Sequence, residues 1–260
     1  MTTIPPYPHG KDLLADKVVV VTAAAGTGIG SAVAARCLEE GARVVISDWH
    51  ERRLAEKLDE LATDHGDRVH ATACDVTDTE QVDTLISGAV ERFGRIDVMI
   101  NNAGLGGSTS IVDMTDDEWS RVLDITLDGT FRATRAALRQ FIAQGGGGAV
   151  VNNSSVVGWR AQAEQSHYAA AKAGVMGLTR CAAVDVAEHG IRVNAVAPSL
   201  ATHPFLAKVA GEELLGELEQ REVFGRAARP WEVANVMVFL ASDYASYLTG
   251  EVVSVSSQHP

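Results

Sequence analysis

The sequence predicts a single α/β domain in which a parallel sheet carries helices on both of its faces. Short strand-like runs alternate with longer helical stretches from Lys17 to the end of the chain. Neither an internal repeat nor a linker interrupts this alternation, so residues 17–260 are expected to form one domain behind an N-terminal extension of residues 1–16. Of the 260 residues, 46% are hydrophobic, which suffices for one large buried core.

The first half of the chain repeats the strand–helix pattern three times. It opens with Val18–Val21, which is apolar on both faces as a strand of a parallel sheet is. A glycine-containing turn follows, and then a helix from about Gly30 to Glu40, which Gly41 ends as a C′ glycine does. The same patterns predict further strands and helices at Arg43–Ser47, Glu51–Leu61, Val69–Cys74, Thr79–Phe93 and Ile96–Ile100.

The second half contains two long helices. One is expected from about Asp116 to Ala143, with a flexible run of glycines at 145–148 after it. The other is expected from about Ser166 to His189, where Gly190 ends it. The remaining strands and the last helix are expected at Ala149–Asn153, Ile191–Ala197, Pro230–Ser242 and Val252–Val255.

Residues 199–229 depart from the alternation. This segment is helical in composition, rich in glutamate and bounded by Pro198 and Pro230. One interpretation is a solvated pair of surface helices. The other is a mobile substrate lid, because the segment follows the carboxyl end of a strand, where ligands bind in such sheets.

Composition excludes several classes of partner. The chain has 22 Lys+Arg against 34 Asp+Glu, a net charge of −12, so nucleic acid is not an expected partner. Its apolar runs are far shorter than the roughly 20 residues that span a bilayer, and we expect neither a signal peptide nor a membrane partner. Three distant cysteines without a CxxC motif predict a reduced, cytoplasmic protein with no disulfide and no metal site: Cys37, Cys74 and Cys181.

The first strand–turn–helix unit is typical of a site for a dinucleotide. Small residues in the turn let the backbone approach a pyrophosphate, and the helix N-terminus supplies free N–H groups and a positive potential. An ordinary tight turn is the alternative interpretation. The turn residues expected to bind the cofactor are Thr22, Ala24, Gly26, Thr27, Gly28 and Ile29.

Asp48 ends the second strand, where a carboxylate can accept hydrogen bonds from an adenosine ribose and repel a 2′-phosphate. This position favours NAD over NADP. Arg52 and Arg53 lie close in sequence and weaken that preference, although we interpret both as outward charges of the next helix.

Tyr168 and Lys172 stand four residues apart on a predicted helix and therefore share a face. An ammonium beside a phenol stabilises the phenolate and lowers the phenol's pKa, so this tyrosine could take a proton from an alcohol. Ser155 ends the preceding strand, and its hydroxyl could hold the substrate oxygen. The alternatives are a packing role for Tyr168 and a capping role for Ser155, but three such residues at one sheet edge favour an enzyme.

Taken together, these motifs resemble the short-chain dehydrogenase/reductase family from Lys17 to Val255. The matching marks are the glycine-rich turn, Asp75-Val76, Asn101-Asn102-Ala103-Gly104, Ser155 thirteen residues before Tyr168-Ala-Ala-Ala-Lys172, Arg192-Val193-Asn194, Pro198 and Leu248-Thr249-Gly250. The resemblance implies a doubly wound, Rossmann-type sheet of about seven strands. It also implies hydride transfer between an alcohol and a carbonyl with NAD(P), and a homotetramer or homodimer.

The resemblance also implies a role for each matching residue. Tyr168 would be the acid/base, Ser155 would orient the substrate, and Lys172 would hold the nicotinamide ribose. Asp48 would bind the adenosine ribose. The other positions expected to contact the cofactor are Asp75, Val76, Asn102, Ala103, Gly104, Pro198 and Thr202.

The chain departs from the family pattern at several positions. The turn is one residue longer than usual, with Ala23 at the place of its first glycine, and Thr126 replaces an asparagine that helps hold a water in the proton relay. Ser199 follows Pro198 in place of glycine, so the nicotinamide-contacting threonine is either Thr202 or displaced to His203. The last residues, 256–260, replace the family's C-terminal glycines.

Several departures occur together in one subgroup. The strings VTAAAGTGIG, NNAGLGG, GWRAQAEQSHYAAAKAG and the ending QHP resemble the dehydrogenases of actinobacterial steroid C/D-ring breakdown. Those enzymes oxidise a ring hydroxyl of a methylhexahydroindanone-propanoate carried as a coenzyme A thioester. Residues that could contact such a substrate, if they are not ordinary loop residues, are Trp159, Arg160, His167 and His203.

Three hypotheses follow. The leading one is an NAD-dependent dehydrogenase that acts on a secondary alcohol of a cyclic, CoA-linked intermediate of steroid degradation. The second is a 3-oxoacyl-thioester reductase, acting on an acyl carrier protein or CoA substrate. The third, from another class, is a nucleotide-binding scaffold without turnover, which the altered turn and Thr126 motivate.

Overall fold

A computed structural model describes residues 4–202 and 212–257 of the chain. Its centre is a sheet of seven strands in the order β3-β2-β1-β4-β5-β6-β7, and every neighbouring pair is parallel. The predicted doubly wound sheet is therefore confirmed. The strands are β1 (Val18–Val21), β2 (Arg43–Asp48), β3 (Val69–Ala73), β4 (Val98–Asn101), β5 (Gly148–Asn153), β6 (Ile191–Pro198) and β7 (Val252–Val255).

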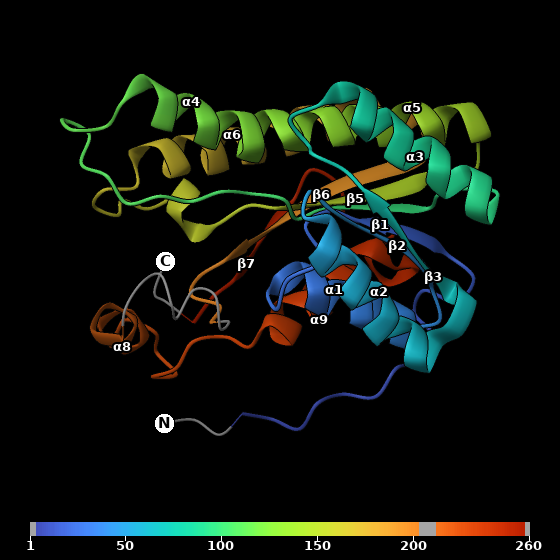
Figure 1. Cartoon of the computed structure of the whole chain (residues 1–260), viewed down its shortest axis with the longest axis horizontal. Helices are drawn as coiled ribbons and strands as arrows, with labels where there is room; N and C mark the ends of the chain where they lie inside the picture. The colour runs from blue at the N-terminus through green and yellow to red at the C-terminus, as the bar shows by residue number, and fades with distance from the viewer. Residues whose placement is uncertain (1–3, 203–211, 258–260) are drawn as a thin grey trace.

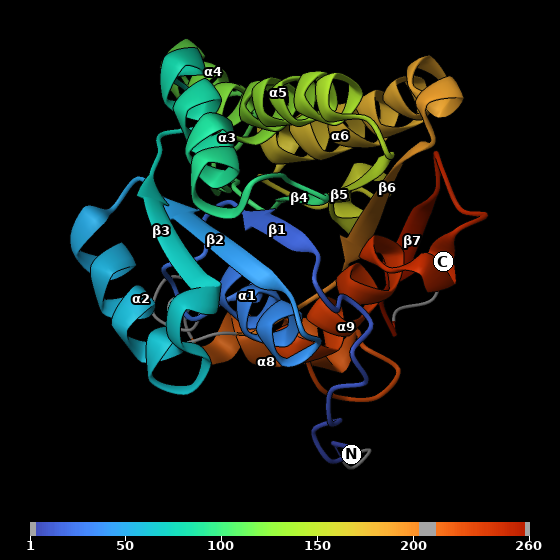
Figure 2. The ribbon, with the colours of Figure 1, turned by 90° about the vertical axis from the view of Figure 1, so that its right-hand side faces the viewer.

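Helices cover both faces of the sheet (Figures 1 and 2). On one face lie α1 (Ile29–Glu39), α2 (Glu51–His65) and α9 (Pro230–Ala241). On the other lie α3 (Thr79–Phe93), α4 (Asp116–Leu123), α5 (Gly129–Gln144) and α6 (Ser166–Asp185). Among the described residues, no helix is both long and apolar enough to cross a membrane.

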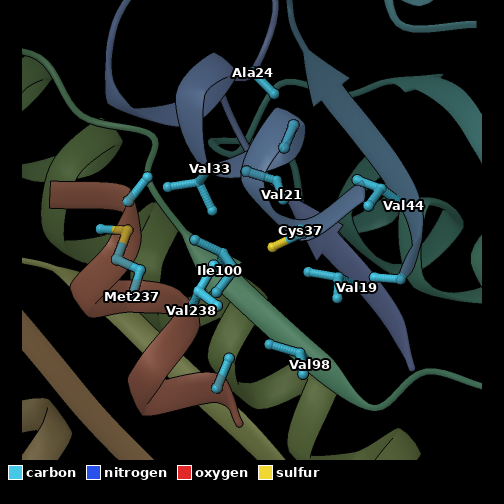
Figure 3. Close-up of a cluster of buried hydrophobic side chains, with 14 of the residues drawn as sticks. Val19, Val21, Ala24, Val33, Cys37, Val44, Val98, Ile100, Met237 and Val238 are labelled. Carbon is cyan, nitrogen blue, oxygen red and sulfur yellow. The ribbon is translucent and has the colours of Figure 1, made fainter. Parts of the chain in front are cut away.

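The core has two halves because the buried strands point side chains to both faces of the sheet. Val19 and Val21 of β1 pack with α1 and α9, where Val33 and Met237 meet them (Figure 3). Alternate residues such as Val20 pack instead with α3, α5 and α6. This alternation explains why β1 is apolar at every position.

The long helix expected at 116–143 is interrupted. Residues Asp124–Asp128 form a π-helical turn between α4 and α5. A π turn adds one residue to a helical turn and is frequently found at functional sites. Here it carries Thr126, whose hydroxyl bonds to a neighbouring loop.

Three other boundaries differ from the expected ones by more than one residue. The helix that begins at Glu51 was expected to end at Leu61 but extends to His65. Gly66, whose φ is 59°, ends it. The strand expected from Ile96 begins at Val98, since the backbone N–H and carbonyl of Ile96 are hydrogen-bonded to the side chain of Gln144. The helix that begins at Ser166 ends at Asp185, and a 3₁₀ turn over Ala187–His189 follows it.

The base of the 199–229 segment is closed by backbone hydrogen bonds between its two ends. Ala228 donates to Leu200 at 2.8 Å, and Thr202 donates to Ala228 at 3.2 Å. Helix α8 (Glu212–Gln220) lies within the segment. Glu222 is 4% exposed and binds Leu200 and the C-terminal Ser257, so this glutamate is not part of a solvated surface as the surface-helix interpretation supposed.

The described part of the N-terminal extension packs against the helices. The ring of Tyr7 meets Trp231 edge-on at 5.3 Å, and its hydroxyl donates to the Glu39 carboxylate. Arg36 of α1 is 3% exposed and lies 5.4 Å from the Tyr7 ring centroid. These contacts attach the extension to α1 and α9.

The core can be tested with a matched pair of substitutions. Val233 of α9 is fully buried, whereas Val184 of α6 is 78% exposed. Val233→Ala should lower the free energy of unfolding by about 2 kcal/mol, because it removes buried methyl groups and leaves a cavity. Val184→Ala should change it by less than about 0.5 kcal/mol in urea titrations; equal losses would contradict the assigned core.

Candidate active site

Side chains join the carboxyl ends of β1, β4 and β5. The hydroxyl of Thr22 accepts hydrogen bonds from the backbone N–H groups of Asn102 and Ala103, both at 3.0 Å. The Asn102 amide donates to the carbonyl oxygens of Thr22 and Ala23 and accepts a hydrogen bond from Asn153 at 3.0 Å. Thr22 and Asn102, predicted to contact a cofactor, thus hold three strand ends together.

Lys172 continues this network onto α6. Its ammonium donates to the carbonyl oxygen of Asn153 at 2.6 Å, and its own carbonyl accepts from the Ser154 hydroxyl at 2.8 Å. The residue is 3% exposed, and this burial lowers the pKa of the Lys172 ammonium to about 8. A buried ammonium is therefore fixed beside the edge of the sheet.

Tyr168 lies one turn before Lys172, and the ammonium nitrogen is 5.5 Å from its ring centroid. The phenol is hydrogen-bonded to the hydroxyl of Ser155, which also accepts from Val157 N–H. Burial raises the pKa of Tyr168, and the Ser155 hydrogen bond opposes this increase only in part. The predicted lowering of this pKa is therefore wrong for the protein alone, because desolvation outweighs the stabilisation of the phenolate.

The first turn leaves the N-terminus of α1 without a side-chain cap, since the N-cap residue is Gly28. Ala23, at the place of the family's first glycine, has a φ of 52°, in the left-handed region that disfavours a Cβ. Gly30 allows the start of α1 to pack closely against Ala23 and Asn102. A Cβ at this position would lie 2.4 Å from both the Ala23 carbonyl oxygen and the Asn102 amide nitrogen. The turn is tight, and its helix N-terminus is open to an anion.

Asp48 is 7% exposed at the end of β2. Its carboxylate accepts hydrogen bonds from the backbone N–H groups of Ala25 at 3.3 Å and His50 at 3.0 Å. The guanidinium of Arg53 lies 4.0 Å from the same carboxylate, so the interpretation of Arg53 as an outward charge is wrong. Arg53 lies in the first turn of α2 and points back to the end of β2, whereas its neighbour Arg52 pairs with Glu56 at the surface.

Asp75 and Val76 follow β3 and have separate roles in the protein itself. The Asp75 carboxylate accepts from the backbone N–H and the hydroxyl of Thr77, which stabilises the turn before α3. Val76 is 7% exposed and packs on Gly129, where a Cβ would lie 2.7 Å from its methyl carbon. Both residues lie at the strand end where a cofactor contact was predicted.

Thr126, which replaces the family's asparagine, bonds to the loop after β4. Its hydroxyl accepts from Leu105 N–H at 2.9 Å and donates to the Leu105 carbonyl at 3.1 Å. A Cβ on Gly104 would lie 3.4 Å from the Lys172 nitrogen and 3.7 Å from this hydroxyl. Thr126 is thus close to Lys172, and its hydroxyl is hydrogen-bonded to the loop backbone.

The four predicted substrate residues have different surroundings. Trp159 is 49% exposed and follows Ser155 by four residues, and Arg160 is half-buried beside it. His167 is 2% exposed and lies behind Gly107, so contact with a substrate would require that loop to move. His203 lies outside the described residues.

Pro198 ends β6, and Thr202 follows it by four residues. Pro198 is the last residue of the strand and is paired in register with Val255. Thr202 is half-buried at the base of the 199–229 segment. Both therefore lie at the same sheet edge as Ser155.

One residue at the site was missed from the sequence, and another was placed wrongly. Asn153 holds Lys172 through its backbone carbonyl, a contact that no side-chain pattern reveals. Arg53 was seen but assigned to the surface, since helical spacing alone does not say how a helix is rotated against the strand before it. The sequence held one signal for the contact between Arg53 and Asp48, since only five positions separate the two residues.

These residues fit a dinucleotide. The open N-terminus of α1 suits a pyrophosphate, the buried Asp48 suits a ribose, and the absence of a side chain at Gly104 leaves space beside Lys172. Tyr168 and Ser155 lie at the same edge of the sheet. The fold and this site define a nucleotide-dependent oxidoreductase.

Comparison with known proteins agrees with this geometry. Residues 23–257 match a family model described as enoyl-(acyl carrier protein) reductase. A Mycobacterium tuberculosis protein named (5R,7aS)-5-hydroxy-7a-methyl-1-oxo-2,3,5,6,7,7a-hexahydro-1H-indene-carboxyl-CoA reductase is 65% identical over 251 residues, which cover 96% of each chain. The cis-4-hydroxycyclohexanecarboxylate dehydrogenase of Sinomonas cyclohexanicum is 43% identical, over 94% of this chain and 96% of its own.

A solved structure is similar throughout. The crystal structure of a short chain dehydrogenase from Mycobacterium smegmatis has a TM-score of 0.88 and 59% sequence identity, over 99% of both chains. The chain belongs to the short-chain dehydrogenase/reductase family, as its motifs predicted. It is therefore an oxidoreductase of a family that uses a nicotinamide cofactor.

The buried ammonium gives a prediction about stability and pH. The pKa of Lys172 falls from 10.5 to about 8 on folding, so the folded state is penalised while the ammonium is protonated and the penalty is lost as the pH rises above 8. Lys172→Met removes this group. The Tm of the variant minus that of the wild type should be larger at about pH 7 than at about pH 9.5, by calorimetry without cofactor. A difference independent of pH would contradict the assigned shift.

Proposed function

We propose that this protein is an NAD-dependent dehydrogenase that oxidises a secondary alcohol on a cyclic, CoA-linked intermediate of steroid degradation. The observation that carries the proposal is the grouping of Tyr168, Ser155 and Lys172 at the edge of the sheet where the nucleotide turn also lies. A proton acceptor, an oxygen-binding hydroxyl and a buried cation then meet at one place.

Each of the three residues has a step in the proposed mechanism. Ser155 and Tyr168 bind the alcohol oxygen, and the phenolate form of Tyr168 takes the hydroxyl proton and becomes the neutral phenol. Lys172, held by the Asn153 carbonyl, keeps a positive charge near the ring and favours the phenolate in the assembled complex. When bound, the nicotinamide supplies the hydride acceptor. In the reverse direction Tyr168 returns the proton to a ketone.

Asp48 supports NAD as the cofactor. Its buried carboxylate has two backbone donors and lies where a ribose hydroxyl would bind and a 2′-phosphate would be repelled. Arg53, at 4.0 Å, partly neutralises that repulsion, so we expect NADP to be used weakly rather than rejected outright. The other turn and strand-end positions named from the sequence complete the proposed cofactor site.

The substrate class rests on the two relatives above. One is named for a hydroxylated, methylated indene-carboxyl-CoA and the other for a hydroxycyclohexanecarboxylate, so both names combine a ring alcohol with a carboxyl group. The half-exposed Trp159 offers an apolar face for a ring, and Arg160 offers a cation for the carboxyl or phosphate end. In this proposal, residues 199–229 form the lid over the ring.

The alternative enzyme is a 3-oxoacyl-thioester reductase. The description of the matching family model, which names an acyl carrier protein substrate, favours it. Asp48 counts against it where NADPH is the reductant. The scaffold hypothesis predicts nucleotide binding without turnover.

The proposal includes a cytoplasmic homodimer or homotetramer. Three large apolar side chains are partly exposed on neighbouring helices α4 and α5, where a second copy could cover them: Trp119, Phe131 and Ile142. All three cysteines are free thiols, which suits a reducing compartment.

Turnover decides between these hypotheses. NADH formation should follow addition of NAD and a hydroxylated methylindanone-propanoyl-CoA, and Tyr168→Phe should lower kcat by about 1000-fold or more while leaving the Kd for NAD within about twofold. Faster turnover of 3-hydroxyacyl-CoA would promote the reductase alternative. Bound NAD without turnover of either substrate would leave only the scaffold.

Cofactor choice gives a separate prediction. Asp48→Ala should weaken NAD binding by about tenfold and narrow the NAD/NADP ratio of kcat/KM, because a ribose acceptor and a repulsive charge are both lost. Adding Arg53→Ala to that variant should weaken NADP again, by removing the remaining cation. An unchanged cofactor preference in Asp48→Ala would exclude Asp48 as the ribose ligand.

A further inference from the structure

A loop beside the catalytic residues is fastened to the segment that leads into α6. The loop comprises residues 104–109, between β4 and α4, and it lies beside residues 164 and 165 (Figure 1). The Ser108 hydroxyl donates to the Glu164 carboxylate at 2.5 Å, and Thr109 N–H donates to the Glu164 carbonyl at 3.0 Å. The side chain of Gln165 donates to the Gly107 carbonyl. We name these three hydrogen bonds the Glu164 latch.

The latched loop runs directly along the catalytic helix. Three of its residues are glycines, and a Cβ built on each would meet a side chain of α6. The distances from that Cβ are 3.4 Å from Gly104 to Lys172 Nζ, 4.0 Å from Gly106 to Tyr168 Cδ2 and 2.6 Å from Gly107 to His167 Nε2. The loop backbone is thus a wall against which Tyr168 packs, and a shift of the loop would change the surroundings of the phenol.

Glu164 has a backbone conformation that it would not adopt by itself. Its φ is 61°, in the left-handed region where a side chain is disfavoured. Such conformations persist only where the surroundings impose them. Here the carbonyl and the carboxylate of one residue both accept hydrogen bonds from the loop, so the strain is sustained by the latch.

The other end of the loop is held independently. The hydroxyl of Thr126, from the π-helical turn, both accepts from and donates to the backbone of Leu105. If the latch is broken, the loop keeps this anchor, and its 107–109 end keeps the 3.3 Å hydrogen bond from the Thr109 hydroxyl to Glu118, so that end is held more weakly. The hydrogen bonds of Asp48 go to residues 25 and 50, and those of the latch stay within residues 107–109 and 164–165, so nucleotide binding at the turn should be unaffected.

We propose that Glu164 is a positioning residue: through the latch it holds the 104–109 loop against Tyr168 and fixes one wall of the space in which the substrate alcohol is oriented. This inference rests on the proposed dehydrogenase function. A looser wall leaves the phenol and its cation in place and lets a substrate adopt unproductive orientations. A bulky cyclic substrate, which needs its ring held at one angle, should be affected more than a small alcohol.

Four single variants test the latch. Glu164→Ala and Ser108→Ala each remove the carboxylate–hydroxyl bond, and Ser108→Ala does so without changing the strained residue. Glu164→Gln retains an acceptor oxygen and should rescue activity. Glu91→Ala, at an exposed glutamate of α3, is the matched control.

We expect Glu164→Ala and Ser108→Ala to lower kcat/KM for the ring substrate by about tenfold, mainly through a higher KM, with Glu164→Gln within about threefold of wild type. A variant with both Glu164→Ala and Ser108→Ala should have a kcat/KM no lower than that of the more impaired single variant, because the two substitutions remove the same hydrogen bond. The Kd for NADH, from fluorescence, should stay within about twofold of wild type. Wild-type kinetics in Glu164→Ala, additive losses, or a parallel loss of NADH affinity would each overturn the proposal.

Hydrogen exchange separates failure of the latch from failure of the proposed function. The amide of Thr109 should exchange faster in Glu164→Ala than in wild type, whereas the amide of Leu105, bound by Thr126, should not. If no alcohol is turned over by the wild type, the proposed function fails and the exchange result decides the latch by itself. Unchanged exchange at Thr109 would overturn it.

Discussion

A continuous chain of hydrogen bonds from the end of β1 to α6 is the constraint on which this site depends. Thr22 at the end of β1 binds the backbone of Asn102, Asn102 binds Asn153 at the end of β5, and the Asn153 carbonyl binds the ammonium of Lys172. The turn before α1 begins at one end of this chain, and Lys172 lies at the other. Because each link joins a different strand or helix, the relative position of these two parts does not depend on a flexible loop.

A second layer of polar side chains lies directly beneath. Asn101 donates to Asn152 at 2.8 Å and to Thr134 at 2.9 Å, and Asn152 donates to Thr179 at 2.9 Å. These residues are almost fully buried, so each hydrogen bond is strong and costly to break. The layer connects β4 and β5 to α5 and α6. It therefore fixes α6, and with it Tyr168 and Lys172, against the sheet.

The departures from the family pattern have local explanations. Ala23 accepts a left-handed conformation at the place of a glycine, in a turn that Asn102 holds through the Ala23 carbonyl. Thr126 does not present a free amide, as an asparagine would, but binds both backbone groups of Leu105. In the family the asparagine helps a water relay. Here the same position anchors the loop that forms a wall beside Tyr168.

The sequence alone determined the parallel α/β fold, the strand ends at which the functional residues lie, and the pairing of Tyr168 with Lys172. These depend on local periodicity and on glycines, which act over a few residues and can be read in order. Only the tertiary structure decided the direction of the Tyr168 pKa shift, the return of Arg53 to Asp48 and the strain at Glu164. Each of those depends on burial or on contacts between segments distant in the chain, or on how a helix is rotated about its axis, and the sequence pattern does not specify these.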